Sequence, residues 1–75
     1  MTIYTVRLIS ANDPKIYEWL ETHIGPGVRE DINAWANPNI KWSKWLRLNY
    51  FPDNYCYHFE FRNERDALLF TLRWG

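Results

Sequence analysis

Three side chains with reactive or titratable groups stand at alternate positions near the end of the chain: the thiol of Cys56, the imidazole of His58 and the carboxylate of Glu60. An imidazole can activate a thiol as a nucleophile, and cysteine and histidine are common zinc ligands. On a β-strand, however, alternate side chains project in parallel from one face and do not converge. A closed zinc site needs four ligands, and the only other cysteine or histidine in the sequence is His23. The spacing therefore predicts neither a catalytic nucleophile nor a metal site, and we expect no cofactor.

A second pattern interleaves basic and aromatic residues in the segment from Lys41 to Arg47, which reads KWSKWLR. Aromatic rings exposed on a sheet can stack on single-stranded bases while arginine and lysine hold the phosphates. The chain has nine basic and nine acidic residues, so its formal net charge is zero. It also lacks the Lys/Arg-Gly-Phe/Tyr-Gly/Ala-Phe run that is typical of RNA-binding sheets. Nucleic-acid binding is therefore the weaker of two binding hypotheses.

Two further patterns predict ordinary structure. Gly25-Pro26-Gly27 is too short for a phosphate loop and lacks its lysine, so it predicts a helix stop. Five acidic residues in the N-terminal half predict a solvated helix face, with a site for a basic partner as the alternative. They are Asp13, Glu18, Glu21, Glu30 and Asp31.

The 75-residue length predicts one domain with one small core, and aromatic residues make up 19% of the chain. So large an aromatic content in so short a chain favours self-association. One cysteine excludes an intrachain disulfide and is typical of a reducing compartment. The sequence shows neither a secretory signal nor a long apolar run. We therefore expect a soluble cytoplasmic protein that does not bind membranes.

The elements that would position these residues alternate between strand and helix. Alternation over residues 2–9 predicts a strand with Tyr4, Val6 and Leu8 on one face. Asn12 or Asp13 is expected to cap a helix that continues to Gly25. Residues 28–36 fit either a short helix or an ordered loop, and residues 37–39 fit a turn.

The second half of the chain predicts a hairpin and a helix. Strands are expected over residues 41–51 and 55–61, joined by a turn at residues 52–54. Asn63 is expected to cap the last helix. The apolar stripe that docks this helix on the sheet is predicted to contain Ala67, Leu68, Leu69, Leu72 and Trp74.

This order predicts an α+β two-layer sandwich with both long helices on one side of the sheet. A right-handed crossover leaves room for the third strand between the first two. The predicted sheet is therefore antiparallel and three-stranded, in the order 1-3-2. It corresponds to a ferredoxin-like fold that lacks its fourth strand.

The sheet face away from the helices is the predicted binding surface, either for a second copy or for another partner. Trp45 and Phe51 are expected to anchor a dimer in which two such faces stack. A solvated face with incidental aromatic residues is the alternative. The candidate residues are Arg7, Trp42, Trp45, Arg47, Asn49, Phe51, His58 and Glu60.

The sequence over residues 59–75 reads FxFxNExDAxxFxLRWG. It resembles the tail of small uncharacterised proteins of tailed phages, including marine ones, in which such an acidic helix follows an aromatic strand. The resemblance covers about a quarter of the chain and carries no assigned activity. It implies a protein made in the cytoplasm of an infected bacterium. It also favours an accessory factor that binds a host or phage protein.

Taken together, these observations favour a non-enzymatic domain that forms a homodimer and binds another protein. A single-stranded nucleic-acid binder is the second hypothesis. An enzyme with a pocket between the sheet and a dimer partner is the third.

Overall fold

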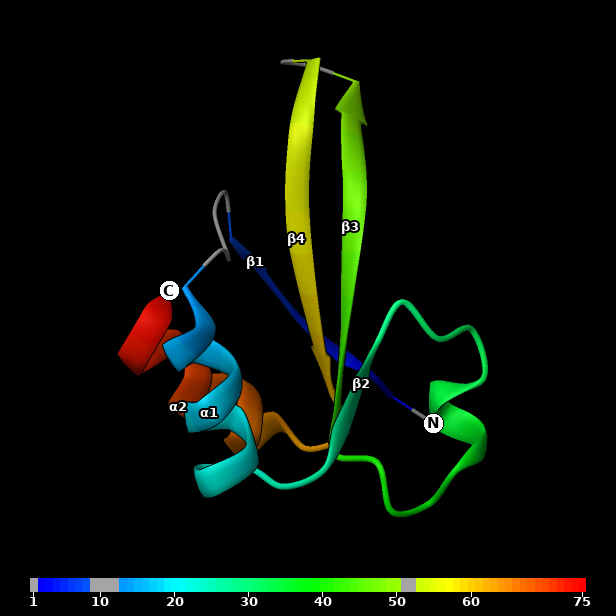
Figure 1. Cartoon of the computed structure of the whole chain (residues 1–75), viewed down its shortest axis with the longest axis vertical. Coiled ribbons are helices and arrows are strands. Elements are labelled where there is room, and N and C mark those ends of the chain that lie inside the picture. The colour runs from blue at the N-terminus through cyan, green and yellow to red at the C-terminus, as the bar shows by residue number, and fades with distance from the viewer. Residues whose placement is uncertain (1, 9–12, 51–52) are drawn as a thin grey trace.

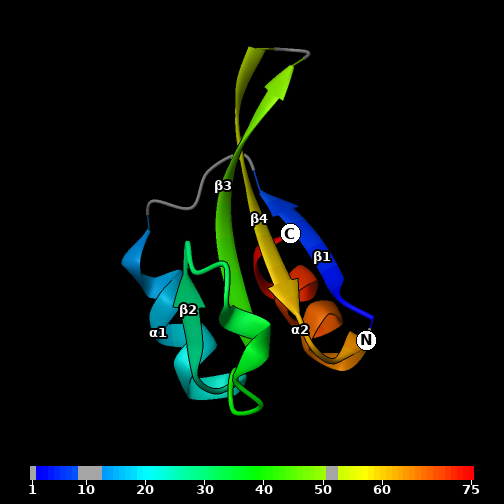
Figure 2. The same ribbon diagram turned by 90° about the vertical axis from the view of Figure 1, so that its right-hand side faces the viewer.

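In the part of the chain that the structure describes, two α-helices cover one face of a four-stranded mixed sheet, and a short 3₁₀-helix lies on the other side (Figure 1, Figure 2). The structure is a computed structural model that describes residues 2–8, 13–50 and 53–75. For residues 48–50 and 53–55 it describes the backbone alone. The elements, in chain order, are β1 (Tyr4–Leu8), α1 (Pro14–His23), β2 (Gly27–Arg29), η1 (Ala34–Ala36), β3 (Trp42–Tyr50), β4 (Asp53–Phe61) and α2 (Glu64–Trp74).

The strands lie in the order β1-β4-β3-β2. β4 is antiparallel to both β1 and β3, whereas β2 is parallel to β3. The predicted three-stranded antiparallel sheet is therefore wrong, and so is the truncated ferredoxin-like fold. The prediction failed at β2, because a three-residue strand is too short to show alternation. Residues 28–36 contain the end of this strand and η1, which is neither of the two predicted arrangements.

The core lies between the helices and the sheet. Alternation in β4 places Phe59 and Phe61 under the helices, as predicted, and both are fully buried. The ring of Phe70 in α2 packs on both, with ring centroids 4.8 Å and 5.2 Å apart. Such aromatic pairs stabilise a core beyond the area that they bury. The buried cluster consists of Ile16, Leu20, Trp42, Phe59, Phe61, Ala67 and Phe70, with Tyr4, Val6 and Leu8 of β1 packed against it.

The buried side of α2 differs from the predicted stripe. Ala67 and Phe70 are buried and Trp74 is half-buried. By contrast, Leu68, Leu69 and Leu72 are 57%, 37% and 85% exposed. The prediction that these leucines dock the helix is wrong. The physical reason is that Phe70 fills the space above Phe59 and Phe61, and this turns the opposite side of the helix to solvent.

The two helices begin differently. Asp13, one of the two residues predicted to cap α1, is its cap. The Asp13 side chain accepts a hydrogen bond from Lys15 N at 2.9 Å. Asn63 occupies the cap position of α2, but its side chain accepts no backbone hydrogen bond. Instead, its Nδ2 donates to Asp66 Oδ2 at 3.4 Å. The predicted side-chain cap at Asn63 is therefore wrong.

Trp42 joins β2 to β3 through a close contact with Gly27, its partner in the parallel pair. The indole covers Gly27 so closely that an added Cβ would lie 2.1 Å from two ring carbons. The indole Nε1 donates to Gly25 O at 2.9 Å. Glycine is therefore required at position 27 for space rather than for backbone conformation.

The connection from β2 to β3 runs over the sheet face that the helices leave open (Figure 1). Ala34 and Ile40 of this connection are buried. Arg62 holds it in place, since its guanidinium donates to Ile40 O at 3.0 Å and to Asn37 O at 3.1 Å. The same guanidinium lies 5.1 Å from the Trp35 ring centroid. Part of the face that was predicted to be uncovered is thus covered by this connection.

The paired strands β3 and β4 extend beyond the rest of the sheet as a two-stranded ribbon (Figure 1, Figure 2). Pairing of β1 with β4 reaches Leu8 and Tyr57, and pairing of β2 with β3 reaches Arg29 and Lys44. The β3–β4 ladder continues to Tyr50 and Asp53.

Candidate binding face of the sheet

The sheet register brings five of the predicted site residues together on the face away from the helices. Arg7, His58 and Trp45 form one row across β1, β4 and β3. Glu60 and Arg47 belong to the rows on either side of it. We call Arg7, Trp45, Arg47, His58 and Glu60 the open face.

The alternation of the strands accounts for this placement. In a strand, successive side chains point to opposite faces, so residues of one parity share a face. The odd residues of β1 and β3 pair with the even residues of β4. The remaining residues of these strands, which include Val6 and Phe59, point to the other face and pack in the core. Burial of the apolar set therefore forces the polar set onto the open face.

His58 lies between two arginines, and this surrounding sets its charge. Burial lowers the pKa of His58 below its usual 6.5, and the positive charges of Arg7 and Arg47 lower it further. The carboxylate of Glu60 acts in the opposite direction and raises the pKa without cancelling the other effects. His58 is therefore neutral at neutral pH. The open face carries two guanidinium groups and one carboxylate.

Trp45 gives the open face an apolar surface beside these charges. Its side chain is half-buried, whereas Arg7 and Arg47 are exposed. The Arg47 guanidinium lies 4.8 Å from the Trp45 ring centroid, which is within the range of a cation–π contact. The contact holds the guanidinium beside the ring, where both groups can meet one partner.

Cys56 belongs to the same strand face but is not accessible. The residue is 5% exposed, and its Sγ lies 3.6 Å from Leu8 O and 3.9 Å from Tyr57 O, as a donor to these carbonyls. A buried thiol with carbonyl partners is placed for packing rather than for attack on a substrate. Within residues 2–8, 13–50 and 53–75, no group of three metal-ligating side chains is brought together.

The other predicted site residues lie elsewhere. Trp42 is 1% exposed and belongs to the core on the helix side, so its predicted place on the binding face is wrong. The spacing in the sequence could have predicted this position, because Trp42 and Leu46 are an even number of residues apart in one strand and must share a face. The backbone of Asn49 pairs with Asn54 in the ribbon, and its side chain lies outside the described part. Phe51 also lies outside the described residues.

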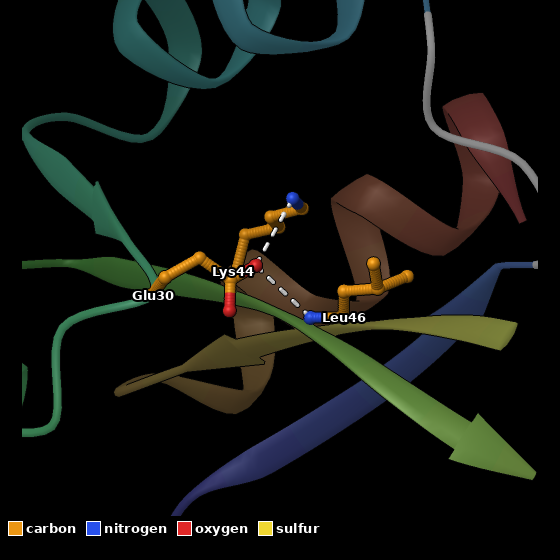
Figure 3. A network of polar contacts seen from close by, with 3 residues as sticks. All are labelled: Glu30, Lys44 and Leu46. Atoms are coloured by element: carbon orange, nitrogen blue, oxygen red, sulfur yellow. Dashed lines mark hydrogen bonds and ion pairs between the residues drawn. The ribbon is translucent and has the colours of Figure 1, made fainter.

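A separate polar cluster, which the sequence did not reveal, lies at the end of β2 (Figure 3). Glu30 Oε1 accepts hydrogen bonds from Lys44 Nζ at 3.1 Å and from Leu46 N at 3.0 Å. The Lys44 side chain is 14% exposed, and its Nζ also lies 5.0 Å from the Tyr57 ring centroid. Glu30 has a positive φ of 57°, which is uncommon outside glycine. The cluster neutralises a largely buried ammonium group and fixes the end of β2.

The part of the chain that the structure describes contains no helix long and apolar enough to cross a membrane. Comparison of the chain with protein-family models, curated proteins and solved structures finds no match.

Proposed function

We propose that the chain is a non-enzymatic protein-binding domain whose open face binds an acidic segment of a partner protein. The observation that supports this proposal is the placement of Arg7 and Arg47 on either side of a neutral His58, next to Trp45. The chain as a whole has no net charge, but this face has an excess of positive charge.

The chemistry of these groups fits a carboxylate ligand. An arginine guanidinium presents a planar fork of donors that matches a carboxylate in two parallel hydrogen bonds. Tryptophan and arginine are also the residues that most often dominate the energy of protein interfaces. Arg47 and Trp45 lie side by side, so one partner residue pair, acidic and apolar, could contact both.

The same charges argue against the sheet-to-sheet dimer that the sequence suggested. Stacking two copies of the open face would bring four guanidinium groups together against two carboxylates. Like charges placed opposite each other at an interface are unfavourable. A partner of opposite charge suits this face better than a second copy does.

The resemblance to tailed-phage proteins gives this proposal a setting. We propose that the chain acts in the cytoplasm of an infected bacterium as an accessory factor, and that the acidic partner is a host or phage protein.

A binding assay with defined peptides tests the proposal. The probe is a fluorescent peptide of alternating glutamate and leucine, and its glutamine counterpart is the control ligand. Fluorescence anisotropy should show binding of the glutamate peptide alone, and the binding should weaken as salt screens the charges. Arg47→Glu should weaken binding about tenfold or more. Lys15→Glu is the matched control, because it makes the same charge change on the exposed start of α1 and should have little effect. Equal binding of both peptides, or equal losses in both variants, would contradict the proposal.

Single-stranded nucleic acid is the second candidate, because Arg7, Arg47 and Trp45 share one face. Two observations count against it: Trp42 is in the core, and the Arg47 guanidinium, 4.8 Å from the Trp45 ring centroid, competes with a base for contact with that ring. We expect no binding tighter than about 10 μM to mixed single-stranded RNA or DNA at about 150 mM salt, a range typical of non-specific contact. Submicromolar, salt-sensitive binding that Trp45→Ala/Arg47→Ala abolishes would establish nucleic acid as the ligand instead.

A further inference from the structure

The solvent-facing side of α2 is apolar, although the helix already buries its opposite side in the core. Leu68, Leu69 and Leu72 form this exposed surface, which we call the leucine stripe. Leu68 and Leu72 are one helical turn apart, and Leu69 lies beside them. A helix in a single chain ordinarily has one apolar side and one polar side. A second apolar side therefore indicates a second contact.

We propose that the leucine stripe binds the same stripe of a second copy, so that two α2 helices pack antiparallel about a two-fold axis. The spacing of the residues supports this occupant. The stripe and its neighbour Arg65 are spaced by three, one and three positions, in the order Arg65, Leu68, Leu69 and Leu72. This spacing is symmetric about the point between Leu68 and Leu69. An antiparallel pair centred there sets Leu68 against Leu69 of the second copy and Arg65 against Leu72 of the second copy. A two-fold interface needs such self-complementarity.

The charges around the stripe are complementary in the same arrangement. Asp66 and Arg73 are seven residues apart, nearly two turns, and so lie on the same side of the stripe. In an antiparallel pair, Asp66 of each copy comes beside Arg73 of the other. The Arg73 guanidinium is already held in the last turn, 4.1 Å from the Trp74 ring centroid. Arg65 would lie beside the last turn of the other helix, where free carbonyls favour a positive charge.

The size of the contact indicates a weak dimer. The exposed fractions of the three leucines together equal slightly less than two whole leucine side chains for each copy. A standard stable interface buries about 800 Å² on each partner, which requires many more residues. We therefore expect the two copies to associate in the micromolar range.

Analytical ultracentrifugation over about 5 to about 500 μM tests the proposal. We expect a monomer–dimer equilibrium that Leu68→Glu/Leu72→Glu weakens at least tenfold. Both side chains are exposed, so the variant should keep the melting temperature of the monomer. Ile32→Glu is the matched control, because Ile32 is 86% exposed outside the helix and its replacement should leave the dimer unchanged.

A charge exchange tests the antiparallel geometry itself. Asp66→Arg and Arg73→Asp should each weaken self-association, and an equimolar mixture of the two variants should form a heterodimer with both ion pairs restored. The inference does not depend on the open face, and Arg47→Glu should leave the dimer intact. A monomer at every concentration, a dimer that the double leucine variant leaves unchanged, or a dimer lost in Arg47→Glu would each overturn the proposal.

Discussion

Replacing Gly27 by alanine tests how β2 is joined to the sheet. The added Cβ would lie 2.1 Å from two carbons of the Trp42 ring, more than 1 Å short of an ordinary contact. The ring cannot move freely, because its Nε1 donates to Gly25 O and Trp42 is fully buried. Overpacking of this kind costs about 1–3 kcal/mol.

Three contributions set the expected magnitude for Gly27→Ala. A shift of the indole also weakens its buried hydrogen bond, which adds about 1 kcal/mol or more. Alanine also lowers the conformational entropy of the unfolded chain, which stabilises the folded state by about 0.4–1 kcal/mol. The net loss is therefore about 1–4 kcal/mol. A domain of this size has a total stability of about 4–11 kcal/mol.

Urea unfolding, monitored by tryptophan fluorescence at low micromolar concentration, measures this loss. In a thermal melt, the melting temperature should fall by roughly 4–30 °C. The control is a double-mutant cycle with Trp42→Phe, which removes the indole nitrogen and the fused ring. In that background the cost of Gly27→Ala should fall by at least about 1 kcal/mol, as for residues in contact. If Gly27→Ala is as stable as the parent, or if its cost is unchanged in Trp42→Phe, the proposed packing is refuted.

Three further predictions follow from the core, the open face and the start of α2. Phe70→Ala should cost about 3–5 kcal/mol, whereas Leu72→Ala, at an exposed position, should change the stability of the monomer by less than about 0.5 kcal/mol in the same urea assay. Because the pKa of His58 is lowered, the folded protein binds fewer protons than the unfolded chain. The free energy of unfolding should therefore fall as pH drops below 6.5 and level off below the pKa of His58 in the folded protein. This fall should be larger in the parent protein than in His58→Gln. NMR titration should also show a higher pKa for His58 in Arg47→Gln, and an unchanged value would argue against the assigned surroundings. Asn63→Ala should lose less than the roughly 1 kcal/mol of a true cap, and a full loss in thermal melts would show that its side chain does cap α2.

The sequence predicted the parts of the fold that strong alternation or capping specifies. Phe59 and Phe61 lie in the core because the sequence alternates over residues 55–61, and Asp13 caps α1 because its side chain suits that position. β2 could not be predicted, since three residues give no periodicity. It forms because Gly27 leaves room for Trp42.

The candidate site was predicted in part, again where strand alternation is strong. Alternation in each strand, together with burial of its apolar residues, places Arg7 and His58 on one face of the sheet. Alternation within β3 also indicates that Trp42 faces the core, but the interleaved basic and aromatic residues around Trp42 suggested a binding surface instead. The exposed leucines of α2 were harder to predict, because Phe70 and Leu72 both fit an apolar helix face. Only the position of the two phenylalanines of β4 decides that Phe70 is the buried one.

Glu30 has a further consequence for how the chain behaves at high concentration. The outer edge of a sheet can add strands from other chains, which is a common route to aggregation. Where β2 ends, β3 would present such an edge, but the Glu30 carboxylate accepts the hydrogen bond of Leu46 N, in the place of an incoming strand's carbonyl. Lys44 holds that carboxylate in position. The pair closes the edge at the point where the four-stranded sheet narrows to the ribbon, so an added strand would find no ladder continuous with β2.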